Sequence, residues 1–472
     1  MAGLTKKTAV RAGAAFPLVL LGLLTLPGCG DSYPKDLNYP PRTDPIVIEL
    51  PKVQPTYLDA PGQLAHWIDS IPEKGGRLID PTAGVEKVQL AKVEEHLSKS
   101  RFDLSDEEVH ELGLASKPEK DSAQEALEAR RDSLKKRIET ITATMKGVAP
   151  KLSAVLKDRF GTPAAPKVGV DDADAFGLDT TTLAEGSKLY RRHCLHCHGL
   201  TGDGRGPTGP WVNPHPRDYR QGQFKFTSTT MSAGGFTSGS RKARREDLLR
   251  TLKQGIEGTS MPSFALLDEQ NELRPLISYV IHLSMRGQVE LSVLNDILGR
   301  EGDPDADVEE LADKKLKAIW NAGWKPSFSA AHAIEVGTVP SYTGKTLGQL
   351  SPDEKVQLDE SIKRGFQQFT TGTASCRSCH NDFGRANDYR YDEWGTISRP
   401  ANLTAGLYRG GRRPLDLYYR IHSGINGAGM TAFSGALRPE DIWDIVNFLE
   451  AMPYKNMLPP DVKAQVYGKG KD

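Results

Sequence analysis

Apolar residues recur at helical spacing in the first third of the chain. One short stretch could line a helix with Val88, Leu90, Val93 and Leu97. A second stripe alternates at steps of four and three residues, as a heptad seam does, through Leu134, Ile138, Ile141, Met145 and Val148. Proline lacks an amide hydrogen, so Pro150 is expected to end or kink this helix. We predict a helical region over 85–160, a hairpin packed on the body; a dimerising coiled coil is the alternative.

The strongest apolar run lies at the N-terminus, from Phe16 to Leu26, after Lys6, Lys7 and Arg11. A basic region followed by a run of this length is typical of a signal peptide and too short to span a bilayer. The run ends in Leu26-Pro27-Gly28-Cys29, which resembles a bacterial lipobox, although Pro27 departs from the usual residue. The resemblance implies that residues 1–29 are a lipoprotein signal peptide and that Cys29 is lipidated. Ordinary cleavage, which would leave Cys29 a free thiol, is the alternative.

Composition narrows the class of protein. The 472 residues carry 61 basic and 61 acidic side chains, and mean hydropathy is −0.47. A balanced charge gives no indication of a nucleic-acid partner, and the body is expected to be soluble. Prolines recur through residues 30–84, which favours an extended tether that would hold the body off a membrane.

The chemistry lies in two copies of one cysteine motif. Cys194-Leu195-His196-Cys197-His198 and Cys376-Arg377-Ser378-Cys379-His380 both have the C-x-x-C-H spacing of a c-type haem attachment site. Two thiols three residues apart can bond the two vinyl groups of one haem, and the following His can ligate its iron. Zinc binding or a disulfide is the weaker alternative. The fifth cysteine is Cys29, so none is left over for a disulfide outside the motifs.

An internal repeat relates the regions that follow the motifs. Gly255-Ile256-x-Gly258-x-x-Met261-x-x-Phe264 matches Gly424-Ile425-x-Gly427-x-x-Met430-x-x-Phe433 at a constant offset. The match extends back to Asp247 and Asp416 and forward to Tyr279 and Phe448, and upstream of the motifs Gly186 and Tyr190 correspond to Gly365 and Phe369. Self-similarity at one offset indicates two copies of one fold, each with its own haem.

Each copy resembles a monohaem cytochrome c domain with His and Met as axial ligands. The resemblance implies a small all-α fold in which an N-terminal helix crosses a C-terminal helix. It implies that Gly186 lets the helix of Tyr279 approach closely, and that Gly365 does the same for the helix of Phe448. The whole chain resembles dihaem c-type lipoproteins of bacterial respiratory chains.

The resemblance also implies a complete ligand set for two covalently bound haems c. His198 and His380 are the proximal ligands, and Met261 and Met430, each in a loop after its motif, are the distal ligands. A methionine is more often a core filler, and the matched positions in the repeat argue against that here. His215 is the best rival ligand in the first copy. Met231 lies in a loop that would hold a ligand poorly, and His193, His196, His282 and His422 are expected to face solvent or a propionate, or to pack.

Two details of the surroundings remain open. A proximal His usually donates its second ring N–H to a carbonyl; in the family a downstream proline supplies it, so Pro207 or Pro210 could serve His198. For His380 no family proline is obvious, since Pro400 is twenty residues away. The basic residues Arg241–Arg245, like Arg409, Arg412 and Arg413, could lie in solvated loops, dock an acidic partner or contact a propionate.

We therefore predict a mainly α protein with two tandem cytochrome c domains, at 176–290 and 350–455. A connector spans 291–349, Ser351-Pro352-Asp353-Glu354 starts a helix as a capping box, and a polar tail at 456–472 is expected to fray.

The predicted function is single-electron transfer at the periplasmic face of a bacterial membrane. Its expected partners are a membrane oxidoreductase complex, an oxidase or a small cytochrome, with membrane attachment through the lipid. A filled iron coordination sphere leaves no site for substrate, which favours a relay over an enzyme. A dihaem enzyme such as a cytochrome c peroxidase is the main alternative, and a haem-based sensor is a weaker one.

Overall fold

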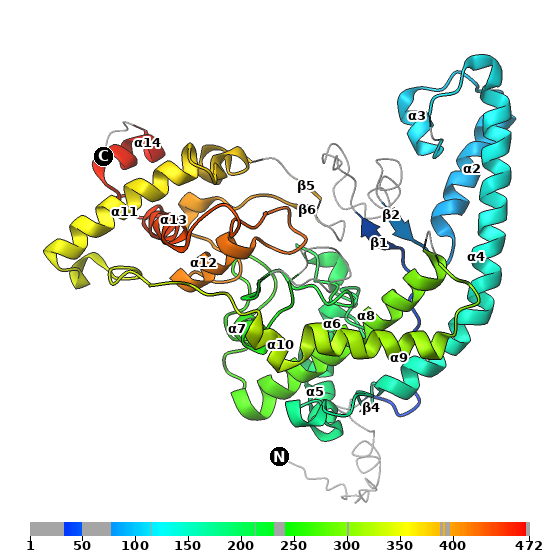
Figure 1. Cartoon of the computed structure of the whole chain (residues 1–472), viewed down its shortest axis with the longest axis horizontal. Coiled ribbons are helices and arrows are strands. Elements are labelled where there is room, and N and C mark those ends of the chain that lie inside the picture. Colours follow the sequence, from blue (N-terminus) through cyan, green and yellow to red (C-terminus); the bar gives the residue numbers. More distant parts are fainter. Residues whose placement is uncertain are drawn as a thin grey trace, which may run out of the picture.

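The computed structural model describes residues 33–49, 77–114, 116–212, 214–230, 241–299, 302–387, 390–391 and 397–468. The predicted mainly α class is confirmed, because helices dominate and the strands form only short two-stranded antiparallel pairs within these residues (Figure 1). The pairs are β1 (Ile46–Glu49) with β2 (Arg77–Ile79), β3 (Gly161–Thr162) with β4 (Ala165–Pro166), and β5 (Arg390–Tyr391) with β6 (Ile397–Ser398).

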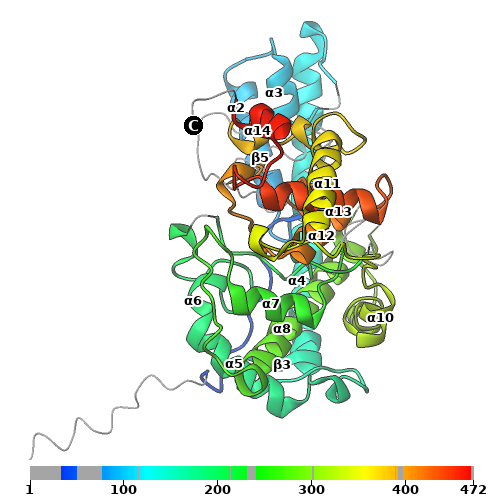
Figure 2. The ribbon, with the colours of Figure 1, turned by 90° about the vertical axis from the view of Figure 1, so that its left-hand side faces the viewer.

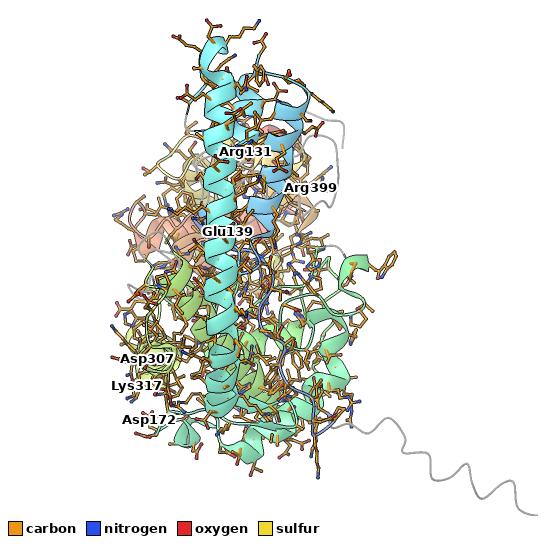
Figure 3. The ribbon with its side chains drawn as sticks, turned by 90° about the vertical axis from the view of Figure 1, so that its right-hand side faces the viewer. Arg131, Glu139, Asp172, Asp307, Lys317 and Arg399 are labelled. Carbon is orange, nitrogen blue, oxygen red and sulfur yellow. The ribbon has the colours of Figure 1, made fainter. Side chains whose placement is uncertain are left out.

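A helical hairpin projects from one side of the molecule (Figure 1). It consists of α2 (Gly84–Ser98), the short α3 (Asp106–Glu111) near its tip, and α4 (Ala123–Phe160). The hairpin has a small apolar core of its own, made by Val93, Leu104, Val109, Leu112, Leu127 and Leu134. Figure 3 shows α4 along the height of the molecule, with Arg131 and Glu139 on its projecting part.

The helix α4 continues through Pro150 to Phe160, so this proline does not end the helix as one of the two expectations had it. Proline removes one amide donor, but the following turns are held by burial in the body. Val148, Leu152, Leu156 and Phe160 are at most 5% exposed and join the core of the next domain. The apolar face of α4 therefore packs into two cores. Its first part lies in the core of the hairpin, and its last part lies in the core of the body.

The first haem unit, called unit one, contains α5 (Thr180–His193), α6 (Leu195–His198), α7 (Arg245–Gln254) and α8 (Arg274–Leu298). The helices α5 and α8 cross where Gly186 meets α8. A Cβ atom built on Gly186 would lie 2.1 Å from the carbonyl oxygen of Pro275 and 2.9 Å from Cβ of Tyr279. Only glycine permits this approach. Then α9 (Val308–Ile319) packs on α8 and α4, and the short α10 (Pro326–Ala331) follows.

The second haem unit, called unit two, contains α11 (Pro352–Thr370), α12 (Pro414–Ser423) and α13 (Pro439–Ala451). Its first helix begins with the predicted capping box, in which the Ser351 hydroxyl accepts from the Glu354 amide and the Glu354 carboxylate accepts from the Ser351 amide. A Cβ atom on Gly365 would lie 2.0 Å from the carbonyl oxygen of Asp444, so α11 and α13 cross as α5 and α8 do.

The C-terminal residues differ from the frayed tail that was expected. Residues Pro460–Tyr467 form α14, and its Val462 and Val466 are each 1% exposed in the core of unit two. Two apolar residues four apart suffice to attach one face of a short helix.

Residues 33–46, here called the N-terminal strap, lie against unit one, whereas the sequence suggested a spacer standing away from the body. The Tyr39 hydroxyl is hydrogen-bonded to the Tyr279 hydroxyl at 2.9 Å, and the Arg42 amide donates to the Glu290 carboxylate at 2.8 Å. Both Asp44 oxygens accept from Arg220, at 2.9 and 2.8 Å, and Asp44 is 8% exposed. Aromatic and charged residues between the prolines thus fix the strap to the body.

Among the described residues, no helix combines the length and the apolar character needed to cross a bilayer. Residues 1–32, with the predicted signal peptide and Cys29, and residues 50–76 of the predicted tether lie outside the described residues.

Candidate haem sites

The first cysteine motif forms one helical turn at the end of α5. The His198 amide donates to the Cys194 carbonyl at 2.9 Å, which closes the turn. Residues three and four apart lie on one face of a helix, so Cys194, Cys197 and His198 project to the same side. The loop after the motif folds back on it, because the amides of Gly206 and Thr208 donate to the carbonyls of Cys197 and His196.

The His198 imidazole is held in the protonation state that a haem iron requires. Its Nδ1 atom lies 3.2 Å from the carbonyl oxygen of Arg217. A carbonyl can only accept, so Nδ1 carries the hydrogen and Nε2 presents its lone pair. Burial lowers the pKa of His198 to about 4, against the opposing effect of this hydrogen bond. The ring is therefore neutral at physiological pH.

The second motif repeats this arrangement. The His380 amide donates to the Cys376 carbonyl at 2.8 Å, and His380 Nδ1 donates to the carbonyl of Ala401 at 3.2 Å. Burial lowers the pKa of His380 as well. Each accepting carbonyl belongs to the residue after a proline, Pro216 or Pro400. The suggestion that Pro207 or Pro210 serves His198 is thus wrong, and the distance of Pro400 along the chain is no obstacle.

The thiols fit haem attachment better than zinc or a disulfide. All four motif cysteines are free. Burial raises the pKa of Cys194 to about 12 and that of Cys376 to about 11, so both thiols are neutral at physiological pH in the absence of a bound group. In the part of the chain that the structure describes, no group of three or more His, Cys, Asp or Glu side chains could hold a metal ion. Two neutral thiols beside one neutral imidazole match the protein side of a c-type haem.

The two predicted methionine loops share a closing hydrogen bond and the backbone conformation at their first residue. The Ile256 amide donates to the Met261 carbonyl at 3.1 Å, and the Ile425 amide to the Met430 carbonyl at 3.0 Å. Each loop begins at a glycine with positive φ, 68° at Gly255 and 70° at Gly424. Both methionines are partly buried against the core of their own unit. The chain thus offers two equivalent thioethers, and their ligation of iron stays a prediction.

The other histidines that were considered as ligands have different positions and contacts in the structure. His215 lies two residues before Arg217, which holds His198, so it belongs to the proximal side. His282 is fully buried, bonds the Phe160 carbonyl at 2.8 Å and stacks on Tyr279. His193 packs edge-on against Phe264 of the methionine loop, while His196 is exposed and His422 half-buried. Met231 lies outside the described residues.

The aromatic cores beside the two motifs differ in one respect. Unit one has tyrosines, whose hydroxyls bond in a chain: Tyr219 donates to Tyr190 at 2.5 Å, and Tyr190 donates to the Gly199 carbonyl at 2.8 Å. The ring centroids of His198 and Tyr219 are 5.4 Å apart. Unit two has phenylalanines packed by their rings alone, at Phe366, Phe369, Phe383 and Phe448.

The two units meet through equivalent helices, α7 and α12. Arg250 of α7 lies between two buried carboxylates that correspond in the repeat, 3.0 Å from Asp247 and 3.2 Å from Asp416. Its guanidinium lies 5.9 Å from the centre of the Tyr419 ring, and position 419 is the repeat equivalent of 250. A contact between two equivalent residues is typical of an interface with local two-fold symmetry.

The methionine loops follow these helices directly, so both lie at the border between the units. Asn426 of the second loop donates to the carbonyls of Phe224 and Arg241 in unit one. A cavity of about 750 Å³ opens beside the first loop, and its lining includes Met261 and Glu257 of unit one with Gly411, Arg412 and Glu450 of unit two. Unit two therefore borders the loop that carries Met261 in unit one.

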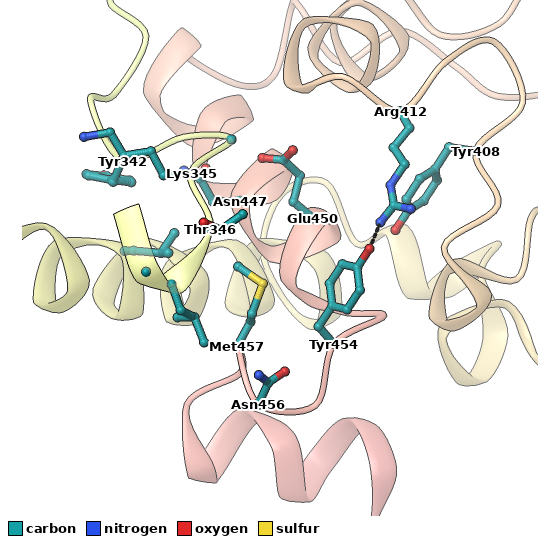
Figure 4. A pocket seen from close by; sticks show the side chains of 14 residues that line it. Tyr342, Lys345, Thr346, Tyr408, Arg412, Asn447, Glu450, Tyr454, Asn456 and Met457 are labelled. Carbon is teal, nitrogen blue, oxygen red and sulfur yellow. Dashed lines mark hydrogen bonds between the residues drawn. The ribbon is translucent and has the colours of Figure 1, made fainter. Parts of the chain in front are cut away.

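A second cavity, of about 550 Å³, lies in unit two away from both cysteine motifs (Figure 4). Lys345, Glu450, Tyr454 and Met457 point into it, and Arg412 donates to the Tyr454 hydroxyl at 2.6 Å. None of the six motif residues lines it. Burial raises the pKa of Glu450 to about 7.

The basic stretch Arg241–Arg245 is neither a solvated loop nor an exposed docking patch, so both of these alternatives are wrong for it, while the contact with a propionate stays a prediction. Arg241 is 8% exposed and bonds Asn426, while Lys242 is 4% exposed and donates to Gln288 at 2.5 Å. Arg245 donates to Ser278 and to the Phe176 carbonyl. In the Gly-rich turn of unit two, Arg413 pairs with Asp416 at 2.9 Å, but its side chain stays 57% exposed.

Sequence reasoning missed several residues that build the sites. The carbonyls of Arg217 and Ala401 could have been found from the prolines that precede them, 18 and 20 residues after their histidines. The strap residues Tyr39 and Asp44 carry no local signal, since their partners lie more than 170 residues away in the chain.

A helical domain closed by crossing helices around a C-x-x-C-H turn is a c-type cytochrome domain, and this chain carries two. Residues 183–284 match the family model described as cytochrome c, and residues 360–449 match the model described as cytochrome C oxidase, cbb3-type, subunit III. These matches imply c-type haem, with its iron, as the covalently bound cofactor of both domains. The six motif residues would hold the two haems.

A search of curated proteins found no match. Among solved structures, a chain of the reducing HAO-like protein complex of Kuenenia stuttgartiensis is similar, at 21% identity and a TM-score of 0.39. The similarity covers 57% of this chain and 95% of that one.

Proposed function

We propose that this protein passes single electrons between its two haems, and through them between respiratory-chain partners at the periplasmic face of a bacterial membrane. Bound haem supplies an iron that takes up and releases one electron. The chain fixes each neutral His through a backbone carbonyl, at 3.2 Å in both units. Met261 and Met430 would hold the iron as distal ligands and would leave no open position for substrate, which favours a relay over an enzyme.

One observation carries this proposal: the interface between the units is built from the helices that lead into the two methionine loops. Arg250 bonds the equivalent carboxylates Asp247 and Asp416, both with fully buried side chains. Breaking a buried pair leaves an uncompensated charge and costs roughly 3–5 kcal/mol. The interface therefore resists separation, and it holds the two methionine loops in a fixed relation, which supports transfer between the haems.

The test is the rate of electron transfer between the haems after rapid reduction of one of them. Arg250→Met should slow this internal step several-fold, because it loosens the interface, while both absorption spectra stay those of the wild type. Arg364→Met is the matched control, since Arg364 pairs with Asp444 at 2.7 Å within unit two and away from the interface. An unchanged rate in Arg250→Met would contradict the proposed route.

The ligation state of the haem iron distinguishes an electron relay from a dihaem enzyme. A relay should show two low-spin haems in both oxidation states, bind carbon monoxide poorly and turn over peroxide no faster than ordinary haem proteins. One high-spin haem together with rapid peroxide turnover would establish a dihaem peroxidase instead.

Membrane attachment through Cys29 belongs to the same proposal. The lipobox-like Leu26-Pro27-Gly28-Cys29 supports it. Cys29→Ser should move the protein from the membrane to the soluble periplasmic fraction. Retention after a salt wash would instead indicate binding through a partner complex.

A further inference from the structure

The strap sets how far the haem units can stand from the lipid-bearing residue. If residues 30–84 formed a free extended tether, 55 residues at about 3.1 Å each could span about 170 Å. The packed strap begins at Tyr33 instead, only four residues after Cys29. Four residues span at most about 14 Å even when fully extended. The free part of the tether is therefore shorter than the diameter of one domain.

Tyr33 lies beside the first haem attachment site. It is 6% exposed, and its ring centre lies 5.5 Å from the guanidinium of Arg191, three residues before Cys194. Burial raises the pKa of Tyr33, and the neighbouring Tyr279 and Cys194 add to this effect. The position closest to the lipid-bearing residue is thus next to the first thiol of unit one.

The strap is firmly held, so this proximity is a fixed property of the fold. Arg42 and Asp44 have side chains 1% and 8% exposed and pair with each other, and they also pair with Asp218 and Arg220. Burial opposes the ionised form of Asp44, but Arg42 and Arg220 prevail and lower its pKa. Releasing the strap would break the pairs of Asp44 with Arg220 and of Arg42 with Asp218, and Asp218 and Arg220 would keep only each other.

Figure 2 shows the course of the strap and the parts of the molecule that lie far from its start. The strap, in deep blue, starts beside α5 at the bottom of the molecule and runs up along unit one toward the hairpin. Unit two and the tip of the hairpin lie at the opposite end. An anchor beside α5 therefore turns unit one toward the lipid headgroups.

We infer that unit one rests against the bilayer surface beside its Cys194 edge, while unit two and the hairpin project away from the membrane. The inference rests on the proposed lipidation of Cys29 and adds the orientation of the molecule. It makes the first haem the one that exchanges electrons at membrane level and the second the one that serves partners in the periplasm.

The experiment uses the full-length lipidated protein in phosphatidylcholine vesicles that contain a nickel-chelating lipid. Paramagnetic nickel at the headgroups speeds the electron-spin relaxation of nearby oxidised haem. The two haem signals are assigned with Met261→Ala and Met430→Ala. We expect the first haem to relax at least about two-fold faster with nickel than without, and the second haem to change much less.

A flexible insertion tests the role of the short span. Twenty Gly/Ser residues between Ser32 and Tyr33 add about 25 Å of average reach, so the nickel effect on the first haem should fall to the level of the second. The same insertion between Gly75 and Gly76, downstream of the strap, is the matched control and should leave the effect unchanged.

Each outcome has a distinct meaning. Equal enhancement of both haems, or a stronger effect on the second, overturns the orientation. A protein that fails to float with the vesicles carries no lipid at Cys29, which overturns the anchor and the orientation together. Electron transfer between the haems is measured separately and does not depend on either result.

Discussion

The two haem units share one fold but fill its interior differently. At equivalent positions, unit one has Tyr190 and Tyr279 where unit two has Phe369 and Phe448. Each hydroxyl of unit one has a partner, the Gly199 carbonyl for Tyr190 and the strap residue Tyr39 for Tyr279. A buried hydroxyl without a partner costs roughly 1–3 kcal/mol. Tyrosine is therefore tolerated in the unit where neighbouring segments supply partners, and phenylalanine occupies the unit without a strap.

The largest expected effect concerns what the units share, the glycine at the helix crossing. Gly186→Ala and Gly365→Ala each place a Cβ atom about 2 Å from a backbone carbonyl oxygen, at 2.1 and 2.0 Å. Overpacking typically costs 1–3 kcal/mol, and backbone cannot yield as a side chain does, so we expect about 3 kcal/mol or more in either unit. Denaturant unfolding would measure this. Gly147→Ala is the control, since no atom lies within 4 Å of its Cβ position, and it should not destabilise.

The next effect is a pH dependence of stability that should differ between the two units. Burial lowers the pKa of His282 in unit one to about 4, while the equivalent position in unit two is Ala451. Between pH 6.5 and 4 the unfolded chain binds a proton that the folded unit refuses, so stability falls as pH falls, by up to about 3 kcal/mol. Unfolding followed at each haem should show this slope in unit one. His282→Gln should reduce this slope in unit one, and an unchanged slope would assign it to other groups such as His198, whose pKa burial also lowers to about 4.

A smaller but more selective effect concerns the distal ligands. Met261→Ala and Met430→Ala should each lower one reduction potential, by on the order of 0.1 V within the roughly 0.8 V range that axial ligands control. Each should also remove one share of the far-red sulfur-to-iron charge-transfer band. Spectropotentiometry would measure both. A variant that shifts both potentials equally would show that the haems are coupled rather than independent.

The smallest effect tests the aromatic difference itself. Tyr39→Phe removes the bond to Tyr279 and should cost about 1 kcal/mol. The reverse change, Phe369→Tyr, buries a new hydroxyl and should cost at least as much, unless unit two offers it a carbonyl. Thermal unfolding of both variants would check this, and a stabilised Phe369→Tyr variant would refute the explanation given for the difference.

Local spacing predicted much of this molecule, because haem attachment and helix caps depend on residues within a few positions of each other. The two C-x-x-C-H turns and the capping box at Ser351 follow from such spacing, and the resemblance to cytochrome c domains implied the roles of Gly186 and Gly365. The Arg241–Arg245 stretch did not, because burial depends on partners such as Asn426 far away in the chain. The continuation of the helix beyond Pro150 could not be predicted for the same reason, because the apolar residues that hold it there pack on a different domain.

The pairing of Arg250 with Tyr419 has a consequence for how such a molecule could originate. A contact between a position and its own copy is what a single-haem chain would make on associating with itself. Joining two copies in one polypeptide turns that association into an intramolecular one, at an effective concentration in the millimolar range for short flexible links. Pairing then no longer depends on how much protein the cell makes, and each half becomes free to change its sequence separately.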